Sequence, residues 1–276
     1  MIALIAGAVV ALLGLFFWIQ KGKREGEGAA MELADTSTVA AVNENYQSIT
    51  GSLGSGNFTH FVELKGQAHA EHPLTSELAQ EKVIYYKAQV IHKYERLEEK
   101  RDSNGKINRR WVSRSETVQD NEQWADGWGL KDSTGFIEVD ASKAKLHHEK
   151  LLSKHEQGNN PPQGLNVNLG GLKLNIGGGT SSNNYRSKGY EYLEYGIRVG
   201  TDLYVLGDAN DRDGVLRVSK PTDRKQPFIV STKSEDELVA TAGSKAKSAK
   251  IGAYVCWGLG AAGVIAGLVM IIMGKG

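Results

Sequence analysis

Two apolar stretches without any charge, Ile2–Ile19 and Ile251–Met273, lie near the ends of the chain and constrain everything between them. As α-helices they would measure roughly 27 and 34 Å, close to the ~30 Å hydrocarbon core of a bilayer. We therefore expect a membrane protein with two spans that contact the lipid bilayer. The first transmembrane helix is predicted over residues 1–20. A juxtamembrane helix and the second transmembrane helix are predicted over residues 241–273.

The charges beside these stretches predict an orientation. Basic residues follow the first stretch and precede the second, and these are Lys21, Lys23, Arg24, Lys245, Lys247 and Lys250. Cationic flanks stay on the cytoplasmic side, so we expect a cytoplasmic domain with both termini outside. A cleaved signal peptide is the alternative, and it expects basic residues before its apolar run. The first ten residues carry none.

Composition narrows the classes of partner and of site. The 33 basic and 32 acidic side chains give a net charge of +1, without the basic block that is typical of nucleic-acid binders. We therefore expect no nucleic-acid partner. The single cysteine, Cys256, lies inside the second apolar stretch. An intramolecular disulfide and a cysteine-based zinc site are therefore not expected.

Periodicity between the spans predicts a β-rich domain. Residues 21–56 are predicted as a linker, charged and glycine-spaced over Gly22–Gly28, with a possible helix over Leu33–Ile49. Apolar residues alternate with polar ones over Val62–Ala68 and Ile84–Val90, which is typical of half-buried strands. We expect residues 57–240 to form an α+β, β-rich domain, barrel-like or sandwich-like, between two transmembrane helices. The strand spacing leaves open whether the strands close as a barrel or form an open sandwich.

Turn and cap signals predict the remaining elements. Asn104-Gly105 predicts a hairpin, because a type I′ turn needs positive φ at both central positions. Ser234 and Glu237 predict a capping box at the start of a helix, with a possible break at Gly243. The other predicted elements are a short helix over Pro73–Ala79, a hairpin over Leu130–Val139, a helix over Ala141–His155, a Gly/Asn-rich insertion over residues 157–184, and strands over Ile197–Val199, Leu203–Leu206, Val215–Val218 and Phe228–Ser231.

Residues with catalytic or metal-binding chemistry do not assemble into a recognisable motif. His147, His148 and His155 fall on the predicted helix as a solvated face, and His69 and His72 on a polar loop. The segment 208–214 is rich in Asp but lacks the ligand spacing of a calcium loop. No phosphate-binding loop and no nucleophile elbow is present in the sequence. We expect no catalytic residue, no metal ligand and no cofactor.

Small residues form a stripe along the second span at helical spacing. The stripe comprises Gly252, Cys256, Gly260, Gly263 and Gly267, and it is the candidate helix-packing face. Ala3, Gly7 and Ala11 form a similar stripe in the first span. Small residues let helix backbones approach closely in a membrane. We expect the two spans to pack together, and homodimerisation is the alternative.

The order of several segments resembles one known family. The segments are KGQA (65–68), VIYYKAQV (83–90), HKYERLEE (92–99), RRWVSRSE (109–116), DSTGFIEVD (132–140), EYGIRVGTDLYVLGDA (194–209), FIVSTKSEDELV (228–239) and a closing apolar span. This arrangement resembles the GIDE family of membrane-anchored E3 ubiquitin ligases from the mitochondrial outer membrane and the chloroplast envelope. The resemblance implies a domain that recognises substrates or partners, and a RING after the second span that recruits a conjugating enzyme.

The sequence stops at Gly276, so we expect a relative without the RING, of a prokaryotic type. Non-catalytic recognition of a protein partner or a membrane-proximal ligand is the expected function. Trp111, Trp124 and Trp128 are the candidate partner surface, and a place in the buried core is the alternative for each of them. The alternative is an E3 ubiquitin ligase-like protein that acts with a RING or a conjugating partner supplied in trans. An envelope scaffold is a third possibility.

Overall fold

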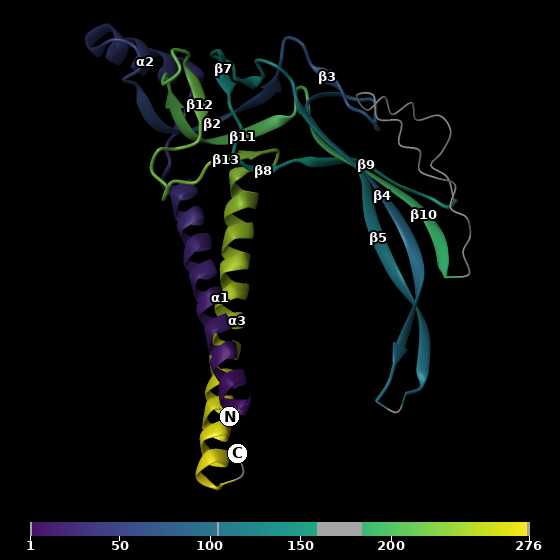
Figure 1. Cartoon of the computed structure of the whole chain (residues 1–276). Helices are drawn as coiled ribbons and strands as arrows, with labels where there is room; N and C mark the ends of the chain where they lie inside the picture. Colours follow the sequence, from purple (N-terminus) through teal and green to yellow (C-terminus); the bar gives the residue numbers. More distant parts are fainter. Residues whose placement is uncertain (1, 104, 159–183, 275–276) are drawn as a thin grey trace. The chain divides into compact units, whose positions relative to one another are not determined.

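The computed structural model describes residues 2–103, 105–158 and 184–274 (Figure 1). The chain divides into two compact units. Unit 1 comprises Met1–Lys65, Asp140–Leu146 and Leu203–Gly276. Unit 2 comprises Gly66–Val139 and His147–Asp202. Strand β2 (Thr59–His69) begins in unit 1 and ends in unit 2.

Two long helices of unit 1 run antiparallel, α1 (Ile2–Leu33) and α3 (Glu235–Ile272) (Figure 1). Both are long and apolar enough to cross a membrane. At 1.5 Å per residue they measure about 48 and 57 Å, so each is longer than a bilayer core. Each helix therefore continues well beyond its apolar stretch.

The predicted linker over Gly22–Gly28 is wrong, because α1 continues through it. Lys21 contacts Glu25 at 2.7 Å and Arg24 contacts Glu27 at 3.2 Å, and both pairs lie at helical spacing. Such pairs support a helix against the cost of its glycines. The possible break at Gly243 is also wrong, since α3 runs through that residue without interruption.

Caps define the other helix boundaries of unit 1. The predicted helix over Leu33–Ile49 is displaced along the chain to α2 (Val39–Leu53). It starts there because the Thr38 side chain accepts a hydrogen bond from the Ala41 N–H. The capping box of Ser234 and Glu237 is confirmed at the start of α3.

The strands of unit 1 surround β11 (Asp202–Asn210). It pairs with β2, β12 (Arg217–Ser219) and β13 (Ile229–Ser231), while β1 (Thr36–Ser37) pairs with β2 and β8 (Lys145–His147) adjoins β13. The strands predicted over Leu203–Leu206 and Phe228–Ser231 are confirmed, and the one over Val215–Val218 starts two residues later. The core combines these strands with both long helices, through Met31, Tyr204, Leu206, Ile229, Leu238 and Ala242.

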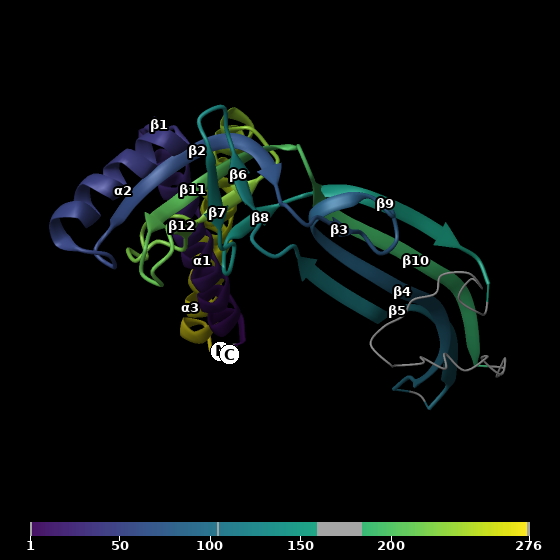
Figure 2. The same ribbon diagram turned by 90° about the horizontal axis from the view of Figure 1, so that it is seen from above.

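Unit 2 contains a five-stranded antiparallel sheet. Its strands are β3 (Leu74–Thr75), β4 (Lys82–Arg101), β10 (Tyr185–Arg198) and β9 (Glu149–Glu156) in that order, with β5 (Ile107–Trp124) also paired to β4. Figure 2 shows β5, β4, β10 and β9 side by side. A small hairpin of β6 (Gly129–Lys131) and β7 (Phe136–Val139) joins the end of β2 and confirms the hairpin predicted over Leu130–Val139.

The hairpin between β4 and β5 is confirmed. Its turn contains Gly105 with φ of +80°, while Asn104 lies outside the described residues. Most of the predicted Gly/Asn-rich insertion, residues 159–183, also lies outside them. The paired strands run from Tyr85 opposite Trp124 to Arg101 opposite Ile107, so β4 and β5 form one long hairpin, and β10 pairs with the other edge of β4 as far as Arg96.

Two predicted helices in this region are wrong. Residues 141–155 contain β8 and β9 instead of a helix, because β9 pairs with β10 from Glu149 opposite Gly196 to Glu156 opposite Tyr190. Tertiary pairing here overrides the local helix signal. The Pro73–Ala79 segment forms β3 and a turn.

The predicted fold class is confirmed. The chain is α+β and β-rich, with a barrel-like or sandwich-like domain between two apolar helices.

Candidate partner-binding surface

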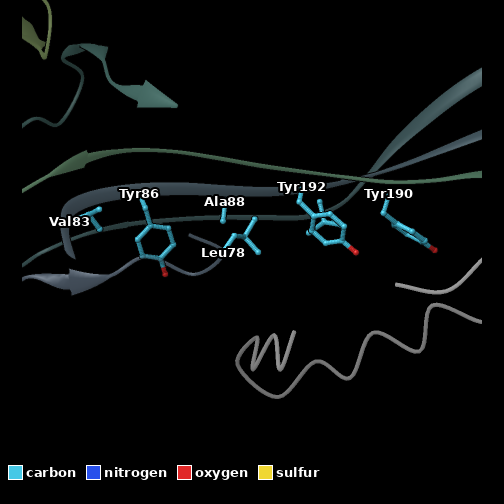
Figure 3. Packing of buried hydrophobic residues seen from close by; sticks show 7 residues of the cluster. Leu78, Val83, Tyr86, Ala88, Tyr190 and Tyr192 are labelled. Carbon is cyan, nitrogen blue, oxygen red and sulfur yellow. The ribbon is translucent and has the colours of Figure 1, made fainter. Parts of the chain in front are cut away.

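One face of the unit 2 sheet carries an apolar core. Seven buried residues pack there, and they are Leu78, Val83, Tyr86, Ala88, Val90, Tyr190 and Tyr192. Figure 3 shows side chains from β4 and β10 on the same side of the ribbons, with the tyrosine hydroxyls directed away from the strands. The alternation of strand side chains places every second residue of β4 on this face.

Two tyrosines of this core have hydroxyl groups that no described residue satisfies. Tyr190 is 1% exposed and Tyr192 is 3% exposed. Neither hydroxyl has a hydrogen-bond partner in the part of the chain that the structure describes. Burial raises the pKa of both phenols, that of Tyr192 to about 12, so both remain protonated donors. A buried polar group without a partner costs about 1–3 kcal/mol, so these hydroxyls are not explained by packing.

Aromatic rings continue from Tyr190 along the same face. The His92 imidazole stacks on Tyr190 with ring centroids 4.6 Å apart, and Tyr94 stacks on Tyr185 at 5.0 Å. His92 Nε2 lies 3.0 Å from the Ser187 hydroxyl. Burial lowers the pKa of His92, so its ring is held neutral. We call His92, Tyr94, Tyr185, Tyr190 and Tyr192 the tyrosine cluster. Tyr94 and Tyr185 are only half-buried, so the cluster reaches solvent.

A buried carboxylate fixes the loop beside this core. Glu194 is fully buried, and its oxygens accept the backbone N–H groups of Glu77, Leu78 and Ala79 at 2.8, 3.0 and 2.6 Å. These three donors are therefore bound to a side chain from β10, which explains the turn found in place of the predicted helix. Leu78 is thereby held against the core.

The opposite face carries a second aromatic group. Trp124 stacks on Trp128 with centroids 4.7 Å apart and lies 4.2 Å from Tyr85. His148 lies 6.0 Å from Tyr85, and burial lowers the pKa of its imidazole. Trp128 is 5% exposed and Trp124 is half-buried. The buried ring of Trp128 therefore packs against the half-buried ring of Trp124.

The third predicted tryptophan lies apart from the other two. Trp111 and Trp124 are thirteen residues apart on β5, or about 40 Å along an extended strand. The Arg186 guanidinium lies over the Trp111 ring at 3.9 Å from its centroid. The structure therefore brings Trp124 and Trp128 together and places Trp111 in a separate cation–π pair.

The histidines and the Asp-rich segment considered as possible sites lie on strands or make contacts within the fold. His147 is the last residue of β8, His155 lies on β9, and His69 packs on Phe136. No group of three or more potential metal ligands occurs among the described residues. In the Asp-rich segment, Asp211 accepts the N–H groups of Gly56 and Phe58 at 2.7 and 2.9 Å.

The small-residue stripe of α3 lies against α1. A Cβ built on Gly260 would lie 3.0 Å from the backbone nitrogen of Ala11, and one on Gly267 would lie 2.8 Å from that of Leu4. Gly252 approaches the ring of Phe17, and a Cβ on Gly7 would lie 2.9 Å from the carbonyl carbon of Gly263. Cys256 is half-buried and carries a free thiol.

The tyrosine cluster was not predicted from the sequence. Its signal is an alternation in two segments, His92 with Tyr94 and Tyr190 with Tyr192, which become neighbours when β4 pairs with β10. Tyr190 lies opposite His92 in that register. The pairing of segments so far apart in the chain was needed to bring these rings together.

Comparisons with known proteins give one positive result. The model of the GIDE family, described as E3 ubiquitin ligase, matches residues 95–267. A search of curated proteins and a search of solved structures each returned no match. The matched range includes the tyrosine cluster apart from His92 and Tyr94, and most of α3.

Proposed function

The chain belongs to the GIDE family, and from this premise we propose that it is a membrane-anchored recognition protein. In this proposal the unit 2 sheet binds a protein partner without catalysing a reaction on it. The two apolar helices α1 and α3 hold the domain at the membrane surface. The partner is recognised through the tyrosine cluster.

The observation that carries the proposal is the pair of buried hydroxyls on Tyr190 and Tyr192. Phenylalanine would fill the same space without leaving a donor unsatisfied. Because both side chains are buried, a partner has to open the surface above them before its hydrogen-bond acceptors satisfy the two donors. Tyrosine is well suited to this role because it combines apolar area with a polar tip. The half-buried rings of Tyr94 and Tyr185 extend the surface outward.

The chemistry of the cluster favours an extended peptide as the ligand. Peptide carbonyl groups are acceptors at regular spacing, and aromatic surfaces bind extended peptides in several recognition modes. The neutral His92 adds a flat ring to this surface. We therefore propose a peptide segment of a protein partner that directs carbonyl groups at Tyr190 and Tyr192.

Partner labelling in native membranes tests this function. A labelling enzyme inserted in the exposed loop around Gly54 would mark neighbouring proteins in the full chain. The double variant Tyr190→Phe/Tyr192→Phe is expected to lose at least one strongly labelled protein. Tyr86→Phe is the matched control, because the Tyr86 hydroxyl already contacts Gln123 at 3.1 Å. Equal labelling in both variants would contradict the proposal.

The proposed orientation places the domain in the cytoplasm, with both termini outside. The basic residues that flank the apolar stretches support it, since cationic flanks stay on the cytoplasmic side. In a Cys256→Ser background, a cysteine at the exposed Ser153 should react with a membrane-impermeant maleimide only after the membrane is opened. Reaction in sealed cells would reverse the orientation.

A second candidate function follows from the family model, which is described as E3 ubiquitin ligase. In this alternative the chain acts with a RING protein or a conjugating enzyme supplied in trans. Recovery of such components in the labelling experiment, and ubiquitin transfer to a labelled protein when they are added, would support it. Recovery of envelope proteins alone would favour a recognition or scaffold role.

A further inference from the structure

Strand β5 leaves a long sheet edge open. Among the described strands only β4 pairs with it, over eighteen residues from Ile107 to Trp124. Gln119 is the one buried residue of β5, and twelve of the others are exposed. An open edge of this length offers a row of backbone N–H and C=O groups to another strand.

Backbone hydrogen bonds at the two ends of β5 show which groups point outward. The Lys106 carbonyl accepts from Asp102 at 3.0 Å, and the Ala125 N–H donates to Ile84 at 2.8 Å. Both residues therefore face β4. In an antiparallel pair such residues recur at every second position. Val90 of β4 pairs with Gln119, and the next residue of β4, Ile91, pairs with Thr117. Val118 therefore lies between these two pairs as an extra residue of β5.

The outward groups follow by counting from both ends of the strand. Residues 108–116 with even numbers face β4, and so do 119, 121 and 123. The odd residues from 107 to 117 and the even residues from 120 to 124 therefore direct their N–H and C=O groups away from β4. The extra residue Val118 separates these two series.

We propose that two copies of this chain associate through antiparallel pairing of their β5 edges, with Ser115 opposite the partner's Ser115. In this register Ser113 meets the partner's Thr117. Beyond the extra residue, Arg109 meets the partner's Glu122. Each of these residues belongs to the outward series, so the register satisfies the backbone along the whole edge. This association does not depend on the proposed function of the tyrosine cluster.

Charge complementarity selects a second copy as the occupant. The first half of β5 carries Arg109, Arg110 and Arg114, and the second half carries Glu116, Asp120 and Glu122. Antiparallel self-pairing therefore brings basic halves opposite acidic halves. Parallel self-pairing in register would place like charges opposite each other, which is unfavourable.

The named register makes these contacts specific. Arg114 lies opposite the partner's Glu116, and Arg109 lies opposite the partner's Glu122, each twice by symmetry. Charged side chains on a sheet edge ordinarily discourage pairing with other strands. Here their separation into two halves disfavours most partners and permits this one. At the end of the edge, Ile107, which is 47% exposed, meets the partner's Trp124.

Cysteine crosslinking tests the register in the full chain in its native membrane. In a Cys256→Ser background, Ser115→Cys places two thiols on residues about 5.5 Å apart between Cα atoms, within disulfide range. Mild oxidation is expected to convert most of this variant to a covalent dimer. Ser113→Cys, whose copies would lie about 13 Å apart, and Ser153→Cys on the other edge strand are exposed controls that should stay monomeric.

A charge swap tests the partner. In the Ser115→Cys chain, Arg109→Glu/Arg114→Glu and Glu116→Lys/Glu122→Lys are each expected to lose the dimer by severalfold when expressed alone. Coexpression of the two should restore a heterodimer. Equal dimer yield in all three cysteine variants, crosslinking of Ser115→Cys to a different protein, or insensitivity to the swap would overturn the proposal.

Discussion

A buried tyrosine of unit 1 and two buried tyrosines of unit 2 differ in whether their hydroxyl groups are satisfied. In unit 1, the Tyr204 hydroxyl donates to Glu63 at 2.9 Å, and Lys65 contacts both Glu63 and Glu235, at 2.9 and 2.8 Å. In unit 2, the hydroxyls of Tyr190 and Tyr192 have no partner among the described residues. A satisfied network stabilises a structure, whereas an unsatisfied one is retained at a cost. This difference supports a structural role of the Tyr204 hydroxyl in unit 1 and is the basis of the recognition role that we propose for unit 2.

The largest effect is expected where α1 and α3 touch. Leucine at Gly260 and Gly267 would place side chains into the backbone of α1, which no rotamer relieves. We expect near-complete loss of crosslinking between cysteines introduced in the two helices. Gly258→Leu is the control, because a Cβ there meets no atom within 4 Å. Unchanged crosslinking in the Gly260/Gly267 variant would show that the helices do not pack this way in a membrane.

The next effect concerns the two buried carboxylates. Glu63 is 1% exposed and Glu194 is fully buried, and each accepts three hydrogen bonds or ion contacts. Alanine at either position leaves buried donors unsatisfied, so we expect a loss of about 3 kcal/mol in the free energy of unfolding. Glu71→Ala, at an exposed position, should change it by less than about 0.5 kcal/mol. Chemical denaturation would measure all three.

The tyrosine cluster should make unit 2 sensitive to acid. Burial lowers the folded-state pKa of His92 below its ordinary value of about 6.5. The folded state therefore resists protonation, so the contribution of His92 to stability is complete above about pH 6.5 and is lost as the pH falls through the folded pKa. His92→Gln should reduce the fall in the thermal midpoint of unfolding between about pH 7 and pH 5. His148→Gln is the comparison, because burial also lowers the pKa of His148 on the opposite face.

The smallest effect on stability is expected at Trp111. Its ring is half-buried under the Arg186 guanidinium at 3.9 Å, and an exposed cation–π pair contributes about 0.5–1 kcal/mol. Trp111→Ala should therefore leave the free energy of unfolding within about 1 kcal/mol of the parent. A severalfold fall in partner labelling would extend the recognition surface to Trp111. Unchanged labelling would confine recognition to the face that carries the tyrosine cluster.

Local signals in the sequence predicted much of the fold. Periodicity identified β2 and β4, turn chemistry identified the hairpins at Gly105 and at residues 132–135, and the capping box located the start of α3. These features depend on residues close in the chain. The predicted helix over 141–155 failed because its outcome depends on β10, which lies some forty residues away.

The candidate site was less accessible from the sequence. Trp111, Trp124 and Trp128 were chosen as large aromatic residues. The distance between Trp111 and Trp124 depends on the length of β5, which carries both. The tyrosine cluster requires the register of β4 and β10, including the irregularity between Ser187 and Gly189. Whether a hydroxyl finds a partner is also a property of the folded protein. A single sequence does not contain that information in a local form.

The most direct test compares the unfolding free energies of two sets of Tyr→Phe variants. Tyr190→Phe/Tyr192→Phe removes hydroxyls that have no hydrogen-bond partner in the described parts of the chain, so we predict equal or higher stability together with loss of the bound protein. Tyr204→Phe removes a hydroxyl bonded to Glu63 and should lower stability by about 1 kcal/mol or more. Destabilisation of both sets to the same extent would contradict the account, because the unit 2 hydroxyls would then have structural partners of their own.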